Sequence, residues 1–229
     1  MRFDAVLFEL EGVLVDTAAS RREALRRSLA QDGVRLTDED FAACCTGLSV
    51  RDAVAAASHR AGARLDDTAL DLAALRAERH FAALSGGGLS LVPGARELVE
   101  GLAASTRLGV VTRLSRGDAE RMLRMAELEY AVEVVVSAED AVPKPHAAPY
   151  ALALARLARR RPLSPDAVLA LEDGPAGIAA ATAAGLRCVV VGPLPAHEAM
   201  RAAGSLPTLA GVTAERLALV AGAATEGAR

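Results

Sequence analysis

The chain has 229 residues, of which 52% are hydrophobic, and a net charge of −3 with acidic and basic residues mixed along its length. This length fits one large domain or a core with a smaller insert, and the composition can bury a sizeable core. The absence of a basic stripe argues against nucleic acid as the main partner. No apolar run approaches the ~20 residues that would span a bilayer, so we expect no membrane partner.

The cysteines predict no covalent or metal framework. Cys44 and Cys45 are adjacent, and Cys188 stands alone in an apolar run. This odd number without metal-type spacing gives neither a disulfide pattern nor a zinc site. The start of the chain also lacks the basic and apolar segments of a signal peptide. We therefore expect reduced thiols in a cytoplasmic protein.

Short runs of nearly continuous apolar residues recur along the chain and predict strands buried on both faces. Each run is followed by a helical pattern, which favours a parallel sheet with crossover helices. The runs are AVLFEL (5–10), LGVVT (108–112), VEVVVS (132–137), AVLALED (167–173) and RCVVVGP (187–193). With a sixth strand expected near 206–210, they predict an α/β protein with a doubly wound parallel sheet.

Residues 17–89 interrupt this rhythm, because no strand-like run occurs there. The expected helices, with Thr37 and Ser49 as N-caps and glycines as stops, are 18–31, 38–45, 50–61 and 66–84. We predict a core domain of residues 1–16 and 90–229 and a small helical cap domain of residues 17–89. The cap is either a lid with hinges at 16–17 and 86–88 or a rigidly packed subdomain.

Polar residues follow the predicted strands at the end where open parallel sheets bind ligands. They are Glu9, Glu11, Thr112, Arg113, Lys144, Glu172 and Asp173. Four carboxylates cannot all remain ionised close together without a countercharge. Mg²⁺ is the natural countercharge, because it prefers oxygen ligands and substrate phosphate. A hydroxyl and a lysine would hold phosphate oxygens, so the set favours phosphoryl transfer.

Lys144 is the single lysine of the chain, whose other 25 basic residues are arginines. A compact ammonium with three donors differs from a planar guanidinium in what it can bind. Its place between two prolines, a few residues beyond a strand, favours a functional role over chance.

The sequence resembles the haloacid dehalogenase superfamily, and within it the branch with a helical cap that contains phosphoglycolate phosphatase and β-phosphoglucomutase. FELEGVLVDT resembles the first motif, which normally reads Phe-Asp-x-Asp-Gly. LGVVTRLSR, the PKP around Lys144, and LALEDGPAGIAAATAAG resemble the second, third and fourth motifs. Together these matches cover nearly the whole chain.

The resemblance implies a role for each matching residue. Glu9 would be the nucleophile and a metal ligand, and Glu11 the general acid and base, with its backbone carbonyl also on Mg²⁺. Thr112 would bind phosphate beside Lys144. Glu172 and Asp173 would complete the Mg²⁺ site. The substrate would be a small phosphorylated metabolite, and the protein a monomer or homodimer.

Several positions depart from the family pattern. Glutamates replace both aspartates of the first motif, although the chain uses 13 Asp elsewhere. The added methylene would move the Glu9 carboxylate by roughly 1 Å, and such a misplacement can cost ~10²-fold in rate. Arg113 adds a cation that would clamp phosphate or neutralise Glu9. The acidic residue that commonly follows Lys-Pro-x-Pro is missing, and Arg21 stands where many relatives carry histidine.

Substrate choice is expected to come from the cap. TGLSVRDAV resembles the family's substrate loop, with Gly47, Ser49 and Arg51 as candidates to face the substrate. Arg51 would either hold a second anionic group or remain a solvated arginine at a helix start.

The sequence leaves three functions open. The leading one is a Mg²⁺-dependent hydrolase of a small phosphorylated metabolite with an atypical Glu-x-Glu motif. A β-phosphoglucomutase-like phosphomutase is a near neighbour. The third is a catalytically impaired protein that binds phosphate or a metabolite, whether the glutamates arose by descent or were introduced.

Overall fold

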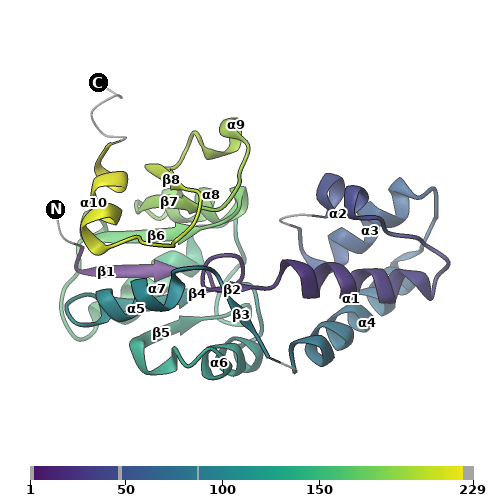
Figure 1. Ribbon diagram of the computed structural model, residues 1–229, viewed down its shortest axis with the longest axis horizontal. Helices are drawn as coiled ribbons and strands as arrows, with labels where there is room; N and C mark the ends of the chain where they lie inside the picture. Colours follow the sequence, from purple (N-terminus) through teal and green to yellow (C-terminus); the bar gives the residue numbers. More distant parts are fainter. Residues whose placement is uncertain (1–2, 46–47, 87, 224–229) are drawn as a thin grey trace. The chain divides into compact units, whose positions relative to one another are not determined.

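The computed structural model describes residues 3–45, 48–86 and 88–223, and its chain forms two compact units (Figure 1). The core unit comprises Met1–Asp16 and Ser90–Arg229, and the helical unit is Thr17–Leu89. The helical unit is therefore an insertion in the sequence of the core unit, and each unit is described by itself below.

The core unit is built on a six-stranded sheet in the order β5-β4-β1-β6-β7-β8, in which all neighbours are parallel. Its strands are β1 (Ala5–Phe8), β4 (Arg107–Val111), β5 (Val132–Val136), β6 (Val168–Glu172), β7 (Arg187–Val191) and β8 (Gly204–Leu206). The predicted α/β fold with a parallel sheet is confirmed. The last strand ends earlier than expected, because Pro207 has no N–H to continue the ladder.

Helices connect the strands of the core unit, and a last helix follows β8 (Figure 1). They are α5 (Ala95–Ala103), α6 (Arg116–Met125), α7 (Ala148–Ala158), α8 (Pro175–Ala183), α9 (Ala196–Ala199) and α10 (Ala214–Ala223), with short 3₁₀ turns at η1 (Glu129–Ala131) and η2 (Pro165–Ala167). α7 and α8 share one core cluster with alternate strand residues such as Leu7 and Ala170. The intervening residues, Phe8 and Leu171 among them, are also fully buried. Burial on both faces explains the continuous apolar runs of the sequence.

A tight turn follows β1 and leads out of the sheet. Val15 N–H donates to the Leu10 carbonyl at 2.9 Å, and Gly12 N–H donates to the Val15 carbonyl at 2.8 Å. Gly12 adopts φ +78°, which favours glycine. The turn ends in β2 (Val15–Asp16), which pairs antiparallel with β3 (Ser90–Leu91). This two-stranded ribbon carries the chain out of the core unit and back into it.

The helical unit contains α1 (Ala18–Ala30), α2 (Asp38–Cys44), α3 (Val50–Arg60) and α4 (Asp67–Ser85). Each bound lies within one residue of the sequence prediction. The predicted caps are confirmed, because the Thr37 hydroxyl accepts from Asp40 N–H and the Ser49 hydroxyl from Asp52 N–H, both at 3.1 Å. Along the described parts of the chain, no helix is long and apolar enough to cross a membrane.

Gly94, the N-cap residue of α5, and Gly101 within that helix provide a matched test of the packing around α5. Gly94 has φ +87°, and a Cβ built there would lie 2.1 Å from the Leu209 carbonyl oxygen. We expect Gly94→Ala to lower the free energy of unfolding by about 2–4 kcal/mol. Gly101 lies in the same helix with nothing within 4 Å of its Cβ position. Gly101→Ala should therefore be neutral or stabilising by up to about 1 kcal/mol in urea titrations. Equal effects of the two substitutions would contradict the close approach at Gly94.

The capping box of α2 predicts a pH dependence. Hydrogen bonds from Thr37 and Arg60 lower the pKa of Asp40 to about 2. A carboxyl with a depressed pKa in the folded state stabilises it above the unfolded pKa of roughly 3.9 and loses that effect as the pH falls. Asp40→Asn should therefore lower the Tm at pH 7, and the difference from the parent should shrink between about pH 4 and pH 2. The control is Glu39→Gln, at the exposed residue next to Asp40. A difference that is constant down to pH 2 would show that the charge is not its source.

Candidate active site

Three parallel strands end together at the candidate site. Phe8, the last residue of β1, lies opposite Val110 on β4 and Leu171 on β6. Glu9 N–H continues the ladder by donating to the Leu171 carbonyl at 2.9 Å. The carboxyl ends of β1, β4 and β6 therefore bring residues from three distant parts of the chain to one edge, as expected for a ligand site of an open parallel sheet.

Lys144 is the centre of this edge. Its Nζ donates to Glu9 Oε2 and to Glu172 Oε1, both at 2.5 Å, and to the Val111 carbonyl at 2.8 Å. The lysine side chain is only 2% exposed. An ammonium has three donors, so all of them are used within the protein. Burial alone would lower the pKa of Lys144, but the Glu172 and Glu9 carboxylates outweigh it and raise that pKa.

Glu9 is buried and held through both of its carboxylate oxygens. Oε2 accepts from Lys144, and Oε1 accepts from the backbone N–H of Leu10 at 2.7 Å. The ammonium supplies a countercharge, and the N–H fixes the orientation of the carboxylate. Glu9 therefore presents an oriented carboxylate at the end of β1.

Tyr150 completes the buried cluster from α7. Its hydroxyl donates to Glu172 Oε1, the same oxygen that accepts from Lys144. Burial and the Glu172 carboxylate raise the pKa of Tyr150 well above its ordinary value, so the hydroxyl keeps the proton that it donates. Burial and Glu9 raise the pKa of Glu172 against the opposing effect of Lys144. The four side chains thus form one hydrogen-bonded ionic cluster.

Two glycines leave space for two carboxylates, those of Glu172 at the end of β6 and of Asp173 directly after it. A Cβ at Gly177 in α8 would lie 2.0 Å from Glu172 Oε2, and a Cβ at Gly12 would lie 2.1 Å from Asp173 Oδ2. The Glu172 carboxylate therefore rests on the backbone of α8. The Asp173 carboxylate rests on the turn that follows Glu11, which ties the fourth motif to the first.

The charge of the donor set fits a hard cation. Burial and the Glu172 and Glu9 carboxylates raise the pKa of Asp173 to about 7, although the side chain is open to water at its surface. Three carboxylates face one ammonium, so negative charge is in excess. Among the described residues, no three His, Cys, Asp or Glu side chains are grouped to hold a metal ion. Mg²⁺ commonly uses only one or two carboxylates with water and phosphate, and Asp173 and Glu9 can provide these.

The remaining predicted residues of the core unit lie around this cluster. Thr112 is buried directly after Val111, and its hydroxyl accepts from Leu114 N–H at 3.3 Å. Arg113 is exposed on the same loop, and Glu11 is half-buried in the turn after β1. The structure thus joins Glu9, Lys144 and Glu172 by direct bonds and places Thr112 next to the Val111 carbonyl that accepts from Lys144.

The candidates in the helical unit have partners of their own. The Arg51 guanidinium donates to Asp71 at 2.6 Å and to Asp67 at 2.7 Å. The Ser49 hydroxyl caps α3, as described above. Arg21 pairs with Glu78 at 2.8 Å and stacks over the Phe81 ring. Gly47 lies outside the described residues.

Sequence reasoning missed Tyr150, although a signal was present. The chain has only two tyrosines, and Tyr150 follows the PKP motif by five residues. Its hydroxyl can be assigned to Glu172 only when α7 is packed against the sheet. The space that Gly177 leaves for Glu172 is likewise visible only in three dimensions.

Comparisons with known proteins show which family the chain resembles in sequence. The profile of the family described as haloacid dehalogenase-like hydrolase matches residues 6–191. A phosphoglycolate phosphatase of Rhodospirillum rubrum is 34% identical, over 82% of this chain and 78% of that protein. A validoxylamine A 7′-phosphate phosphatase of Streptomyces hygroscopicus is 31% identical, over 82% of this chain and 84% of that protein.

A solved structure is also similar over nearly the whole chain. The crystal structure of CbbY from Rhodobacter sphaeroides in complex with phosphate has a TM-score of 0.79 and 26% sequence identity. The alignment covers 95% of this chain and 100% of that one. The fold of the chain is therefore shared over nearly its whole length with that structure.

Gly177 offers a direct test of the Glu172 position. Alanine normally stabilises a helix relative to glycine, but here its Cβ would overlap the Glu172 carboxylate. We expect Gly177→Ala to lower the free energy of unfolding by about 1–3 kcal/mol. The control is Gly117→Ala in the first turn of α6, where nothing lies within 4 Å of the Cβ position. Denaturant titrations that show Gly177→Ala to be as stable as the parent would contradict the described contact.

Proposed function

Because the chain belongs to the haloacid dehalogenase-like hydrolases, we propose that it hydrolyses the phosphate monoester of a small metabolite, with Glu9 as nucleophile. One observation carries this proposal. The Glu9 carboxylate is oriented by Leu10 N–H and Lys144 at the strand edge that also carries Thr112 and Glu172. An ionised, oriented carboxylate is what nucleophilic attack on phosphorus requires.

In the first step, a Glu9 oxygen attacks phosphorus and forms an acyl phosphate while the bond to the ester oxygen breaks. Glu11 gives its proton to that oxygen, so the metabolite leaves as an alcohol. Lys144 and Thr112 hold phosphoryl oxygens at the ends of β1 and β4. Because all Lys144 donors are used within the protein, the ammonium must share or exchange one of them when substrate binds.

In the second step, Glu11 takes a proton from water, and the water oxygen attacks the phosphorus of the acyl phosphate. The bond between phosphorus and the Glu9 oxygen breaks, inorganic phosphate leaves, and the carboxylate is restored. Lys144 is then again the countercharge of Glu9. Both steps depend on positioning and charge more than on covalent chemistry of other groups.

Mg²⁺ belongs to this proposal as the cofactor, which Glu9, Glu172, Asp173 and the Glu11 backbone carbonyl would hold. When bound, it would neutralise charge on the carboxylates and on the transferred phosphoryl group. The raised pKa of Asp173 supports this assignment, because a nearby cation would stabilise the ionised carboxyl.

Substrate selection is assigned to the helical unit, which we propose acts as a cap domain. The relatives named above act on different phosphorylated compounds, phosphoglycolate and validoxylamine A 7′-phosphate. This spread supports a small phosphorylated metabolite as the substrate class. Ser49 and Arg51 are engaged inside the helical unit, so a role in binding substrate would require them to leave Asp52 and the Asp67–Asp71 pair.

A second candidate is binding of phosphate without turnover. It is favoured by the state of Glu9, both of whose oxygens already accept strong hydrogen bonds. Attack requires Glu9 to move toward phosphorus, and this would lengthen the bond to a buried ammonium. Glutamate has one methylene more than the aspartate of the family motif, so the distance from the backbone to the reacting oxygen is also altered.

The test measures phosphate release from phosphoglycolate, a panel of sugar phosphates and an aryl phosphate, with Mg²⁺ and with a chelator. We expect turnover by the chain that is lost on chelation. Glu9→Gln should reduce kcat by at least about 10³-fold, because the amide is not a nucleophile. Glu9→Gln keeps the shape of the side chain, so its Tm serves to separate a catalytic loss from a folding loss.

The double substitution Glu9→Asp/Glu11→Asp separates the two candidates. If it turns over and the parent chain does not, the second candidate is correct and the scaffold is silenced at its first motif. If neither protein releases phosphate from any substrate, hydrolysis is the wrong reaction. Equal kcat values of the parent and Glu9→Gln would remove Glu9 from the mechanism.

A further inference from the structure

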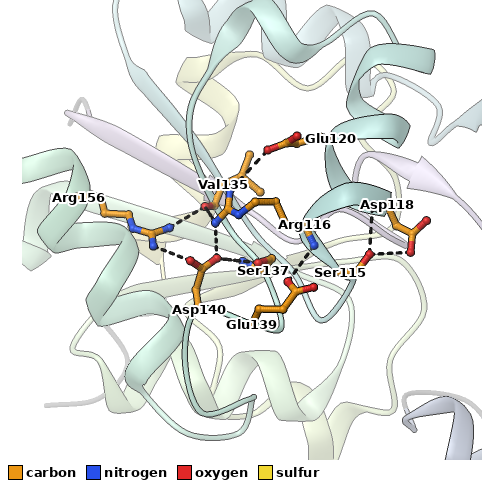
Figure 2. A network of polar contacts seen from close by, with 9 residues as sticks. All are labelled: Ser115, Arg116, Asp118, Glu120, Val135, Ser137, Glu139, Asp140 and Arg156. Carbon is orange, nitrogen blue, oxygen red and sulfur yellow. Dashed lines mark hydrogen bonds and ion pairs between the residues drawn. The ribbon is translucent and has the colours of Figure 1, made fainter.

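A second ionic network of the core unit is centred on Asp140 (Figure 2). Asp140 Oδ2 accepts from Arg116 Nη2 at 2.5 Å and from the hydroxyl and backbone N–H of Ser137 at 2.7 and 2.8 Å. Asp140 Oδ1 accepts from Arg156 Nη2 at 2.6 Å. One carboxylate therefore joins the start of α6, the loop after β5 and the far end of α7.

The first arm of this network joins two loops that carry site residues. The loop after β4 contains Thr112, and the loop after β5 leads to Lys144. Hydrogen bonds of 2.9 Å link them beyond the strands, from Thr112 N–H to the Val136 carbonyl and from Ala138 N–H to the Leu114 carbonyl. Farther along, Arg116 N–H donates to Glu139, and the Arg116 side chain reaches Asp140. The first residues of the two loops, 112–116 and 136–140, are thus held together.

The second arm joins these loops to α7. Arg156 donates to Asp140 and to the Val135 carbonyl, the latter at 2.9 Å. Tyr150 lies on the same helix and donates to Glu172. The helix is therefore tied at one end to the Lys144 cluster and at the other end to Asp140.

We propose that Asp140 is a positioning residue that fixes Thr112, Lys144 and Tyr150 relative to one another. Asp140 bonds a residue in the segment of each one: Arg116, where the loop that carries Thr112 enters α6, Ser137 in the loop that leads to Lys144, and Arg156 on the helix of Tyr150. Asp140 precedes Lys144 by four residues on the same loop, and its proposed role needs no contact with substrate. The proposal rests on the proposed function only where phosphate binding is used as a readout.

Charge explains why this position calls for aspartate. Two guanidinium groups converge on a side chain that is 13% exposed, and the carboxylate neutralises them. Hydrogen bonds from Arg156 and Ser137 hold the pKa of Asp140 well below its ordinary value. An amide at this position would keep the shape but leave the two cations facing one another. The amide would therefore weaken the contacts of all three segments together.

Asp140→Asn tests this inference, with Glu127→Gln as the control. Glu127 also pairs with an arginine, Arg96 at 3.7 Å, but neither residue belongs to the two loops. We expect amide hydrogen exchange of residues 112–116 and 137–144 to accelerate together by about tenfold in Asp140→Asn. The affinity for inorganic phosphate, measured by calorimetry, should fall by about tenfold. Glu127→Gln should change neither quantity.

The outcomes separate positioning from plain stabilisation. A lower Tm with unchanged loop exchange and unchanged phosphate affinity would overturn the proposal, as would equal effects of the control. If the parent chain binds no phosphate, the proposed function fails, but joint acceleration of the two loops still supports the positioning role. If Asp140→Asn does not fold, Arg116→Gln removes one arm only. Arg116→Gln should then accelerate amide exchange in residues 112–116 but not in α7, because Arg156 still bonds Asp140. Equal acceleration in both segments would overturn the proposal.

Discussion

The buried ammonium of Lys144 is the constraint on which the core unit depends. Its desolvation is offset only because Glu9, Glu172 and the Val111 carbonyl each accept one of its three donors. Removing one partner from such a buried group generally costs about 3–5 kcal/mol. The strands β1, β4 and β6 must therefore end at the same level, because each supplies one acceptor. The parallel register of the sheet and the ionic cluster are two aspects of one arrangement.

The contacts of Glu9 show what a glutamate does at the first position of the first motif. The Glu9 side chain is long enough to reach Lys144 while its other oxygen returns to the Leu10 N–H of its own backbone. In the proposed mechanism, the same length also sets where the reacting oxygen lies. A shorter side chain would hold its carboxylate nearer to the backbone and farther from the ammonium. The proposal therefore sets the stability of the ion pair against the reactivity of the carboxylate at this residue.

Much of this architecture could be predicted from the sequence, for reasons that particular elements make clear. Continuous apolar runs predicted the buried strands, and capping residues such as Thr37 and Ser49 predicted helix bounds to within one residue. Strand ends predicted that Glu9, Lys144 and Glu172 meet. The ribbon of β2 and β3 was missed because two-residue strands have no periodicity. Tyr150 and Asp140 were missed because their partners are set by helix packing, which no local pattern records.

The Asp140 network also covers the exposed edge of the sheet at β5. β5 is an edge strand, and an unpaired edge carbonyl invites pairing with another chain. The Val135 carbonyl instead accepts from Arg156 at 2.9 Å and from Arg116 at 3.4 Å. The two arginines that occupy this edge require a countercharge, and Asp140 supplies it from the loop that leads to Lys144. Protection of the β5 edge and alignment of the site loops therefore depend on one carboxylate. A substitution of Asp140 that frees the two arginines from the edge would also loosen the loops that carry the site residues.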